Sequence, residues 1–162
     1  MSNRMQTAHA PRHLVAGRTR KTALIRMLVS LLALALVGGA FAAEELVVVV
    51  NHDNPVASIS AADLKRLYTG KLVRLGDQKM VPVNQPLDSS AAAAFLDGFI
   101  GMTKTEYEQF WMQHQTHAGV IPPMIQRTAA NVLLVVSQLP GGIAYMWTAD
   151  ADSTVKVVSI TE

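Results

Sequence analysis

Apolar runs alternate with turn-forming residues along residues 43–162 and divide them into short elements. Leu46–Val50 is an unbroken apolar run with four β-branched residues, a pattern typical of a strand that is covered on both faces. Shorter apolar runs bounded by turn formers predict three more strands. The predicted strands are Leu46–Val50, Met80–Val83, Ile143–Trp147 and Val155–Ile160.

Apolar residues at helical spacing, together with capping residues, predict four helices. Ser60 and Thr103 are each followed three residues later by an acidic residue, as in a capping box. The predicted helices are Ser60–Tyr68, Ala91–Leu96 with Asp88 or Ser89 as its cap, Thr103–His114, and Ala129–Leu139 capped by Thr128. Connections are expected at Asn51–Ser58, Leu72–Lys79 and His117–Met124. This order of strands and helices predicts an α/β domain.

Residues 1–42 have the three parts of a secretory signal. A basic region without acidic residues precedes an apolar core at Met27–Val37, and Ala40–Ala42 has the small residues that a signal peptidase accepts. The core is shorter than the roughly 20 apolar residues of a membrane span. The sequence therefore predicts a cleaved signal peptide (1–42), followed by a single periplasmic domain (43–162). An uncleaved membrane anchor that extends through Ala43 remains the alternative.

The net charge of +2 does not describe the predicted domain. Six of the 14 basic residues lie in the leader, so residues 43–162 carry eight basic and twelve acidic residues. An acidic domain without a basic stripe is not expected to bind nucleic acid. The chain has no cysteine, so export would bring no disulfide to the fold.

The segment Met80–Gly98 places a strand, a polar turn and a helix start in immediate succession. Asn84–Asp88 interrupts the strand, and Pro86 has no amide hydrogen to give a sheet. Backbone N–H groups and the positive end of a helix dipole are expected at such a junction, where they can hold a small anion. The plainer interpretation is a strand-to-helix connection with a serine cap, and both stay open.

Other residues give weaker indications of chemistry. His114 and His117 lie three residues apart, which on a helix places both on one face. No fixed spacing links His52 to this pair and no cysteine or clustered carboxylate completes a metal site, so no metal or other cofactor is predicted. Ser89 and Ser90 do not lie in a G-x-S-x-G turn, and no catalytic base is placed by the sequence, which predicts a protein that is not an enzyme.

The aromatic residues of the third predicted helix share one face. Tyr107, Phe110 and Trp111 could line a pocket, but their helical spacing favours packing in the core.

Four segments carry a family resemblance: Ser58–Lys71, Val81–Ser90, Phe95–Trp111 and Val135–Met146. In this order they resemble the later part of the phosphate-binding proteins of ABC importers. The resemblance implies a reduced type 2 periplasmic-binding-protein fold, an α/β domain with a mostly parallel central sheet flanked by helices. It also implies phosphate or another oxyanion as ligand and a membrane permease as partner.

The sequence departs from this family at the residues expected to bind the ligand. The family's N-terminal phosphate loop has no counterpart here. Its arginine falls on Gln85, its serine on Ser89, its glycine on Ser90 and its threonine on Ala91, while Asp88 adds a negative charge. A hydrogen bond to a charged group contributes roughly 1.5–3 kcal/mol, so these changes imply weak binding.

Two functions are therefore expected as alternatives. The first is an exported solute-binding-like protein that binds phosphate or a similar oxyanion weakly at Gln85, Ser89, Ser90 and Ala91. The second is an envelope interaction protein that does not act in transport, keeps the fold and binds another envelope protein, with a vestigial anion site.

Overall fold

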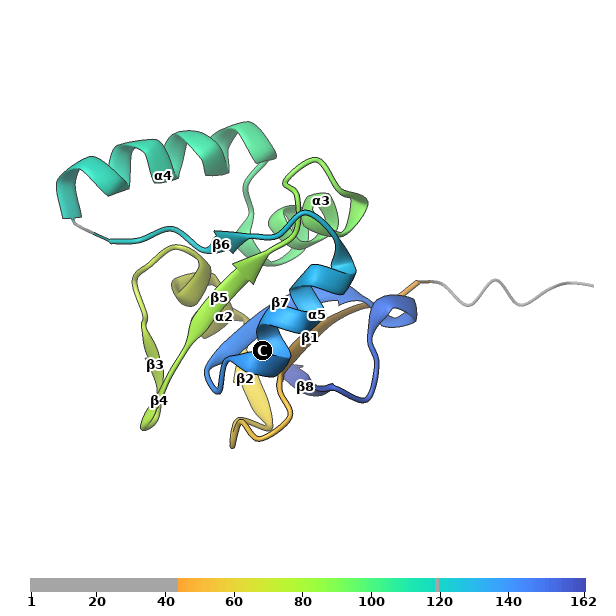
Figure 1. Ribbon diagram of the computed structural model, residues 1–162. Helices are drawn as coiled ribbons and strands as arrows, with labels where there is room; N and C mark the ends of the chain where they lie inside the picture. The colour runs from red at the N-terminus through yellow and green to blue at the C-terminus, as the bar shows by residue number, and fades with distance from the viewer. Residues whose placement is uncertain (1–43, 119) are drawn as a thin grey trace, which may run out of the picture. The chain divides into compact units, whose positions relative to one another are not determined.

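The computed structural model describes residues 44–118 and 120–162, apart from the side chains of 116–118 (Figure 1). The predicted signal peptide lies outside the described residues, so its cleavage remains a prediction.

A six-stranded mixed sheet forms the centre of the fold (Figure 1). In spatial order its strands are β2 (Ser58–Ser60), β8 (Val155–Thr161), β1 (Leu46–Asn51), β7 (Gly142–Trp147), β5 (Val81–Asn84) and β6 (Met124–Ile125). Three of the five pairings are parallel, whereas β1 is antiparallel to both of its neighbours. Two short strands, β3 (Arg74–Leu75) and β4 (Gln78–Lys79), form a separate hairpin.

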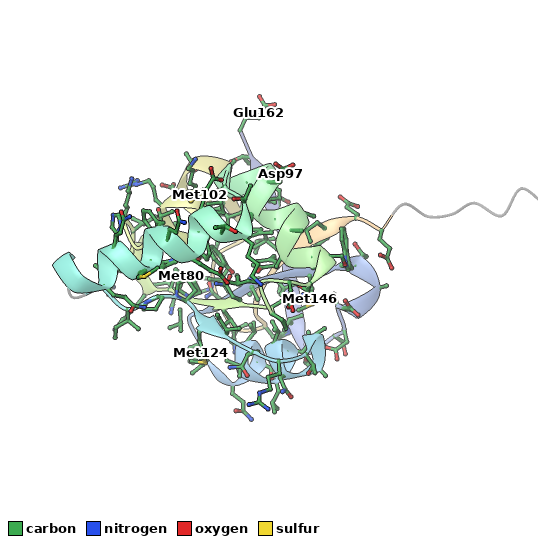
Figure 2. The ribbon with its side chains drawn as sticks, turned by 90° about the horizontal axis from the view of Figure 1, so that it is seen from above. Met80, Asp97, Met102, Met124, Met146 and Glu162 are labelled. Atoms are coloured by element: carbon green, nitrogen blue, oxygen red, sulfur yellow. The ribbon has the colours of Figure 1, made fainter. Side chains whose placement is uncertain are left out.

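Helices cover both faces of the sheet, as the view from above shows (Figure 2). On one face lie α2 (Ala61–Tyr68), α3 (Ser90–Phe95), the π-helix η1 (Leu96–Ile100) and α4 (Lys104–Ala118), and on the other lies α5 (Ala129–Gln138). A short 3-10 turn, η2 (Thr148–Asp150), follows β7. The predicted α/β class with a mostly parallel sheet and flanking helices is confirmed.

The side chains of strand β1 show why helices pack on both faces of the sheet. Val48 and Val50 contact the core under α2, α3 and α4, whereas Val49 contacts the core under α5. All three are at most 1% exposed, as the unbroken apolar run predicts for a strand between two layers.

The predicted caps are found at the helix starts. The hydroxyls of Ser60, Ser89 and Thr128 each accept a hydrogen bond from the amide three residues later. At α4, Glu106 accepts from the Thr103 amide at 2.7 Å, and the Glu106 amide donates to the Thr103 hydroxyl, which completes a capping box. These local bonds fix where the chain turns from sheet to helix.

Some predicted boundaries were wrong. The predicted loop Asn51–Ser58 ends in a short strand, since Ser58 pairs with Ser159. Helix α4 continues to Ala118, and neither glycine nor proline interrupts residues 104–118, so the predicted loop His117–Met124 starts too early. That loop also ends in β6, which is held by β5 through only two residue pairs.

Candidate functional site

The elbow between β5 and α3, residues 84–91, is built around the Ser89 cap. The Ser89 hydroxyl accepts a 3.1 Å hydrogen bond from the Ala92 amide, while the Ser89 amide donates to the Pro86 carbonyl at 2.9 Å. Of the two predicted caps, Ser89 is therefore the one used. Its extended backbone (φ −72°, ψ 153°) turns the chain directly into the helix.

The first two amides of α3 have no acceptor among the described residues. They belong to Ser90, which is exposed, and to Ala91, which is buried with its amide and is only 1% exposed as a residue. Amides in the first turn of a helix carry partial positive charge and need an outside partner. An oxygen of water or of a small anion can supply it.

Trp147 stands beside this helix start. Its indole Nε1 donates a 3.0 Å hydrogen bond to the Ser90 hydroxyl. We did not predict Trp147 as a site residue, because its place beside Ser90 depends on β5 and β7 being parallel neighbours, which brings their carboxyl ends to one edge of the sheet. The Ser90 hydroxyl thus keeps its own hydrogen to donate elsewhere.

The Gln85 side chain is bonded to the neighbouring strand β7. Gln85 is 6% exposed, and its side-chain Nε2 donates a 3.1 Å hydrogen bond to the Tyr145 carbonyl oxygen. The structure thus brings the Ser89 and Ser90 hydroxyls and the Ser90 and Ala91 amides to one helix start, with the Gln85 side chain bonded to β7. Asp88 is exposed on the turn between them.

A buried polar network centred on Asn84 lies next to the elbow. The Asn84 amide donates to the Tyr107 hydroxyl at 3.4 Å, and the Tyr145 hydroxyl donates to Asn84 Oδ1 at 3.3 Å. The Tyr107 hydroxyl in turn donates to the Tyr68 carbonyl at 2.9 Å. These bonds connect β5, β7, α2 and α4, so the network fixes the end of β5 from which the elbow starts.

The tyrosines of this network are held in their neutral form. Burial, followed by the neighbouring tyrosines, raises the pKa of Tyr68 well above its ordinary value. Burial also raises the pKa of Tyr107 and Tyr145, and hydrogen bonds only partly offset it. At neutral pH all three hydroxyls therefore remain hydrogen-bond donors.

The histidines do not form a ligand cluster in the described part of the chain. His114 Nδ1 lies 3.0 Å from the Phe110 carbonyl oxygen, and its ring stacks on that of Phe110 at 3.9 Å. His52 is exposed on the turn after β1, and the His117 side chain lies outside the described residues. Within 44–115 and 120–162, no three histidine, aspartate or glutamate side chains meet at a possible metal site.

Two of the three aromatic residues singled out in α4 are core residues. Tyr107 is 1% and Trp111 6% exposed, and their rings meet edge to face at 6.3 Å. Phe110 packs against the same core from a partly buried position. The predicted core role is confirmed.

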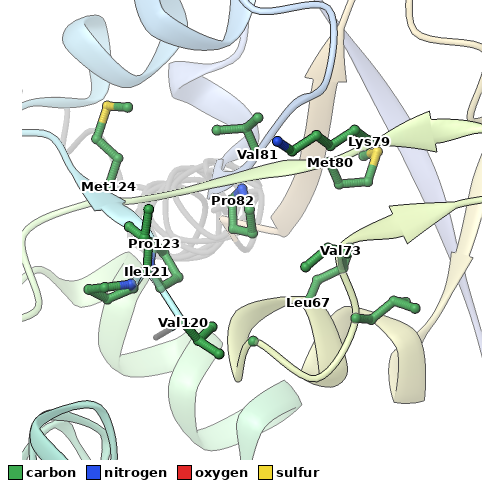
Figure 3. A pocket seen from close by; sticks show the side chains of 13 residues that line it. Leu67, Val73, Lys79, Met80, Val81, Pro82, Val120, Ile121, Pro123 and Met124 are labelled. Atoms are coloured by element: carbon green, nitrogen blue, oxygen red, sulfur yellow. The ribbon is translucent and has the colours of Figure 1, made fainter. Parts of the chain in front are cut away.

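A second feature is an apolar groove of about 500 Å³ at the other end of β5 (Figure 3). It lies between the end of α2, the start of β5 and the segment Val120–Met124. None of the elbow residues lines it. In the described part of the chain, no helix is both long and apolar enough to cross a membrane.

Comparison with known proteins finds similar folds among solved structures but no matching sequence family. No family model and no curated protein matches the chain. It is similar in structure to an ABC-type phosphate transport receptor from Vibrio cholerae, with a TM-score of 0.57, 21% identity, and coverage of 72% of this chain and 46% of the receptor. PstS from Borrelia burgdorferi also gives a TM-score of 0.57, at 16% identity, over 74% of this chain and 48% of PstS.

A possible phosphate binding protein from Planctomyces limnophilus matches with the same TM-score of 0.57, at 17% identity, over 74% of this chain and 42% of that protein. The chain therefore spans a little under half the length of these three proteins. The similarity shows that the fold resembles part of a PstS-like binding protein.

Proposed function

We propose that this chain is an exported, solute-binding-like protein that binds phosphate or a similar oxyanion weakly at the start of α3. The observation that supports it best is the amide of the exposed Ser90, which has no acceptor among the described residues, beside the Ser90 hydroxyl. Two of the similar structures are named as an ABC-type phosphate transport receptor and a possible phosphate binding protein, which favours an oxyanion over other ligands. Export rests on the predicted signal peptide, and delivery of the oxyanion to a membrane permease is part of the proposal.

Weak binding follows from the charges around the elbow. No basic residue lies within residues 84–91, and Asp88 places a carboxylate beside the helix start. Gln85 offers a neutral amide, and that amide is bonded to Tyr145. Without a charged partner worth roughly 1.5–3 kcal/mol, we expect a phosphate Kd in the micromolar to millimolar range.

The decisive experiment removes one amide hydrogen without removing the helix. Ser90 is the first residue of α3 and follows an extended residue, a position that proline favours. Ser90→Pro deletes the N–H and the hydroxyl, whereas the matched variant Ser90→Ala deletes the hydroxyl alone. Calorimetry with phosphate and sulfate should show binding by the native chain, weaker binding by Ser90→Ala and a further loss of about tenfold or more in Ser90→Pro.

Three results would contradict parts of the proposal. Equal phosphate affinity in Ser90→Pro and Ser90→Ala would mean that the anion does not bind the Ser90 amide. If the native chain binds neither anion up to about 10 mM, the elbow is not an anion site. Recovery of an intact leader in the membrane fraction, instead of a chain that begins at or next to Ala43, would contradict cleavage.

The second candidate is an envelope interaction protein with a vestigial anion site. The exposed apolar side chains near the groove favour it, with Val73 57%, Ile121 87% and Ile125 54% exposed. Apolar surface in one region typically marks a binding surface for another molecule. Absence of anion binding together with capture of a defined envelope protein by the native chain would support this function.

A further inference from the structure

The apolar groove has a closed floor and an open rim. Its floor includes Leu67, Met80 and the buried Pro123, the first two of which are at most 3% exposed. Its rim includes Ile121, which is 87% exposed, and Val73, which is 57% exposed. Figure 3 shows Val120, Ile121 and Pro123 on one side and Leu67 with Val73 on the other, with Pro82 between them. A volume of about 500 Å³ lies within the range of small-molecule sites.

The groove is the basic part of an acidic domain. Lys79 is its single charged lining residue, and the described residues place no carboxylate within ion-pair distance of it. Segments 67–82 and 120–127, which form the groove and its surroundings, carry four basic residues and one acidic residue, Asp77. The rest of residues 44–162 carries four basic and eleven acidic residues. An anionic group is therefore attracted to this face and repelled elsewhere.

The groove wall offers few main-chain hydrogen bonds. Pro122 and Pro123 have no amide hydrogen, and the adjoining strand β6 is only two residues long. A peptide that adds as a further strand needs a row of such bonds. An aliphatic chain needs none, because burial of its apolar surface drives its binding.

We propose that this groove binds a free aliphatic carboxylate. The chain lies along Leu67, Met80 and Pro123, and the carboxylate pairs with the Lys79 ammonium, whose nitrogen Figure 3 shows near Val81. The site is separate from the elbow, so the proposal does not depend on the proposed oxyanion binding.

The two tryptophans report separately on the two sites. A Cβ atom placed on Gly70, a groove residue, would lie 2.9 Å from Trp111 Cη2, so the Trp111 ring is next to the groove wall. Trp147 instead bonds Ser90 at the elbow. In Trp147→Phe the indole fluorescence comes from Trp111 and reports on the groove, and in Trp111→Phe it comes from Trp147 and reports on the elbow.

The test titrates Trp147→Phe with decanoate and follows methionine methyl signals of the native chain by NMR. We expect a Kd between about 10 µM and 1 mM, which is ordinary for a ligand of this size. The signals of Met80 and Met124, which line the groove, should shift, whereas those of Met102 and Met146, which lie elsewhere (Figure 2), should not. Lys79→Gln should weaken binding about two- to fivefold, while the matched variant Lys104→Gln on α4 leaves it unchanged.

Several outcomes would overturn the proposal. The first is equal binding of decanoate and decyltrimethylammonium. The second is an equal shift of all methionine signals, and the third is no shift of any signal with decanoate up to about 1 mM. Binding to anionic vesicles without binding of decanoate would point to a membrane surface. A concentration-dependent dimer that shifts Met80 and Met124 without ligand would point to a second copy of the chain. Phosphate titration of Trp111→Phe separates each of these results from failure at the elbow.

Discussion

The Gln85 side chain is bonded to the backbone carbonyl of Tyr145. The bond, 3.1 Å from Nε2 to the carbonyl oxygen, lies beyond the last backbone pair of β5 and β7, which is Pro82 with Ile143. The side chain therefore continues the connection between these strands after their backbone pairing has ended. Gln85 holds the elbow against the sheet, whether or not an anion binds.

This position makes Gln85→Arg an informative variant. A guanidinium at a site that is 6% exposed loses its hydration, and the elbow offers it no carboxylate other than the exposed Asp88. We expect the free energy of unfolding to fall by about 1–3 kcal/mol without phosphate and to recover in part with it, because a bound anion pairs the charge. Thermal melts at several phosphate concentrations measure both effects.

The exposed Gln138 on α5 supplies the matched control. Gln138→Arg adds the same charge at the carboxyl end of a helix, where a cation is favourable, and should not respond to phosphate beyond the native chain. If both variants gain the same stability from phosphate, the anion does not bind at the elbow.

The Asn84 network predicts a clear loss of stability. Asn84 is 1% exposed and connects the Tyr107 and Tyr145 hydroxyls. Asn84→Ala leaves both hydroxyls without this partner and should lower the free energy of unfolding by about 1–3 kcal/mol in urea titrations. The matched variant is Asn131→Ala. Asn131 is exposed, and its backbone amide, not its side chain, donates to the Thr128 cap, so this variant should change the free energy of unfolding by less than about 0.5 kcal/mol. Comparable losses in the two variants would mean that Asn84 contributes little.

The sequence predicts where strands and helices lie along the chain better than it predicts which elements pair with one another in space. The apolar run at Val48–Val50 and the caps at Ser60, Ser89 and Thr128 act within a few residues of the chain, so local patterns suffice to place them. Strand β6 has no such local signal, because its two residues are strand only through their pairing with β5.

In the candidate site, too, local sequence patterns predict the element but not its contacts with distant strands. The helix start at Ser89 could be predicted from the order of strand, turn and helix. The bonds from Gln85 to Tyr145 and from Trp147 to Ser90 depend on β7 lying beside β5. Hydrophobic periodicity identifies strands but not their order in a sheet, so neither bond could be derived from it.

Substitution by alanine is expected to have opposite effects on stability at two glycines, Gly141 and Gly98. A Cβ on Gly141 would lie 2.0 Å from the Lys79 carbonyl oxygen, a backbone atom that cannot move without displacing the start of β5. Gly141→Ala should therefore cost about 3 kcal/mol or more of stability. Gly98 in η1 has no atom within 4 Å of such a Cβ, so Gly98→Ala should be neutral or stabilise by up to about 1 kcal/mol. Urea unfolding compares them, and a tolerated Gly141→Ala would contradict this packing.

The last prediction concerns stability at alkaline pH. The chain has three tyrosines, and all three are buried with a raised pKa: Tyr68, Tyr107 and Tyr145. In the unfolded chain a tyrosine titrates near pH 10. The folded state therefore keeps these protons at pH values where the unfolded state has lost them. Stability from this source is complete below about pH 10 and is lost as the pH rises above it, because the unfolded state then binds fewer protons.

The same difference in proton binding sets how steeply the free energy of unfolding falls with pH. Each tyrosine contributes up to about 1.4 kcal/mol per pH unit, so the three together contribute up to about 4 kcal/mol per unit above pH 10. Urea unfolding at a series of pH values measures the decline, and tyrosinate absorbance near 295 nm should increase only as the protein unfolds. Tyr107→Phe should reduce the tyrosine contribution by about one third. Tyrosinate absorbance that develops near pH 10 in a protein still folded by circular dichroism would show that the three hydroxyls are not buried as described.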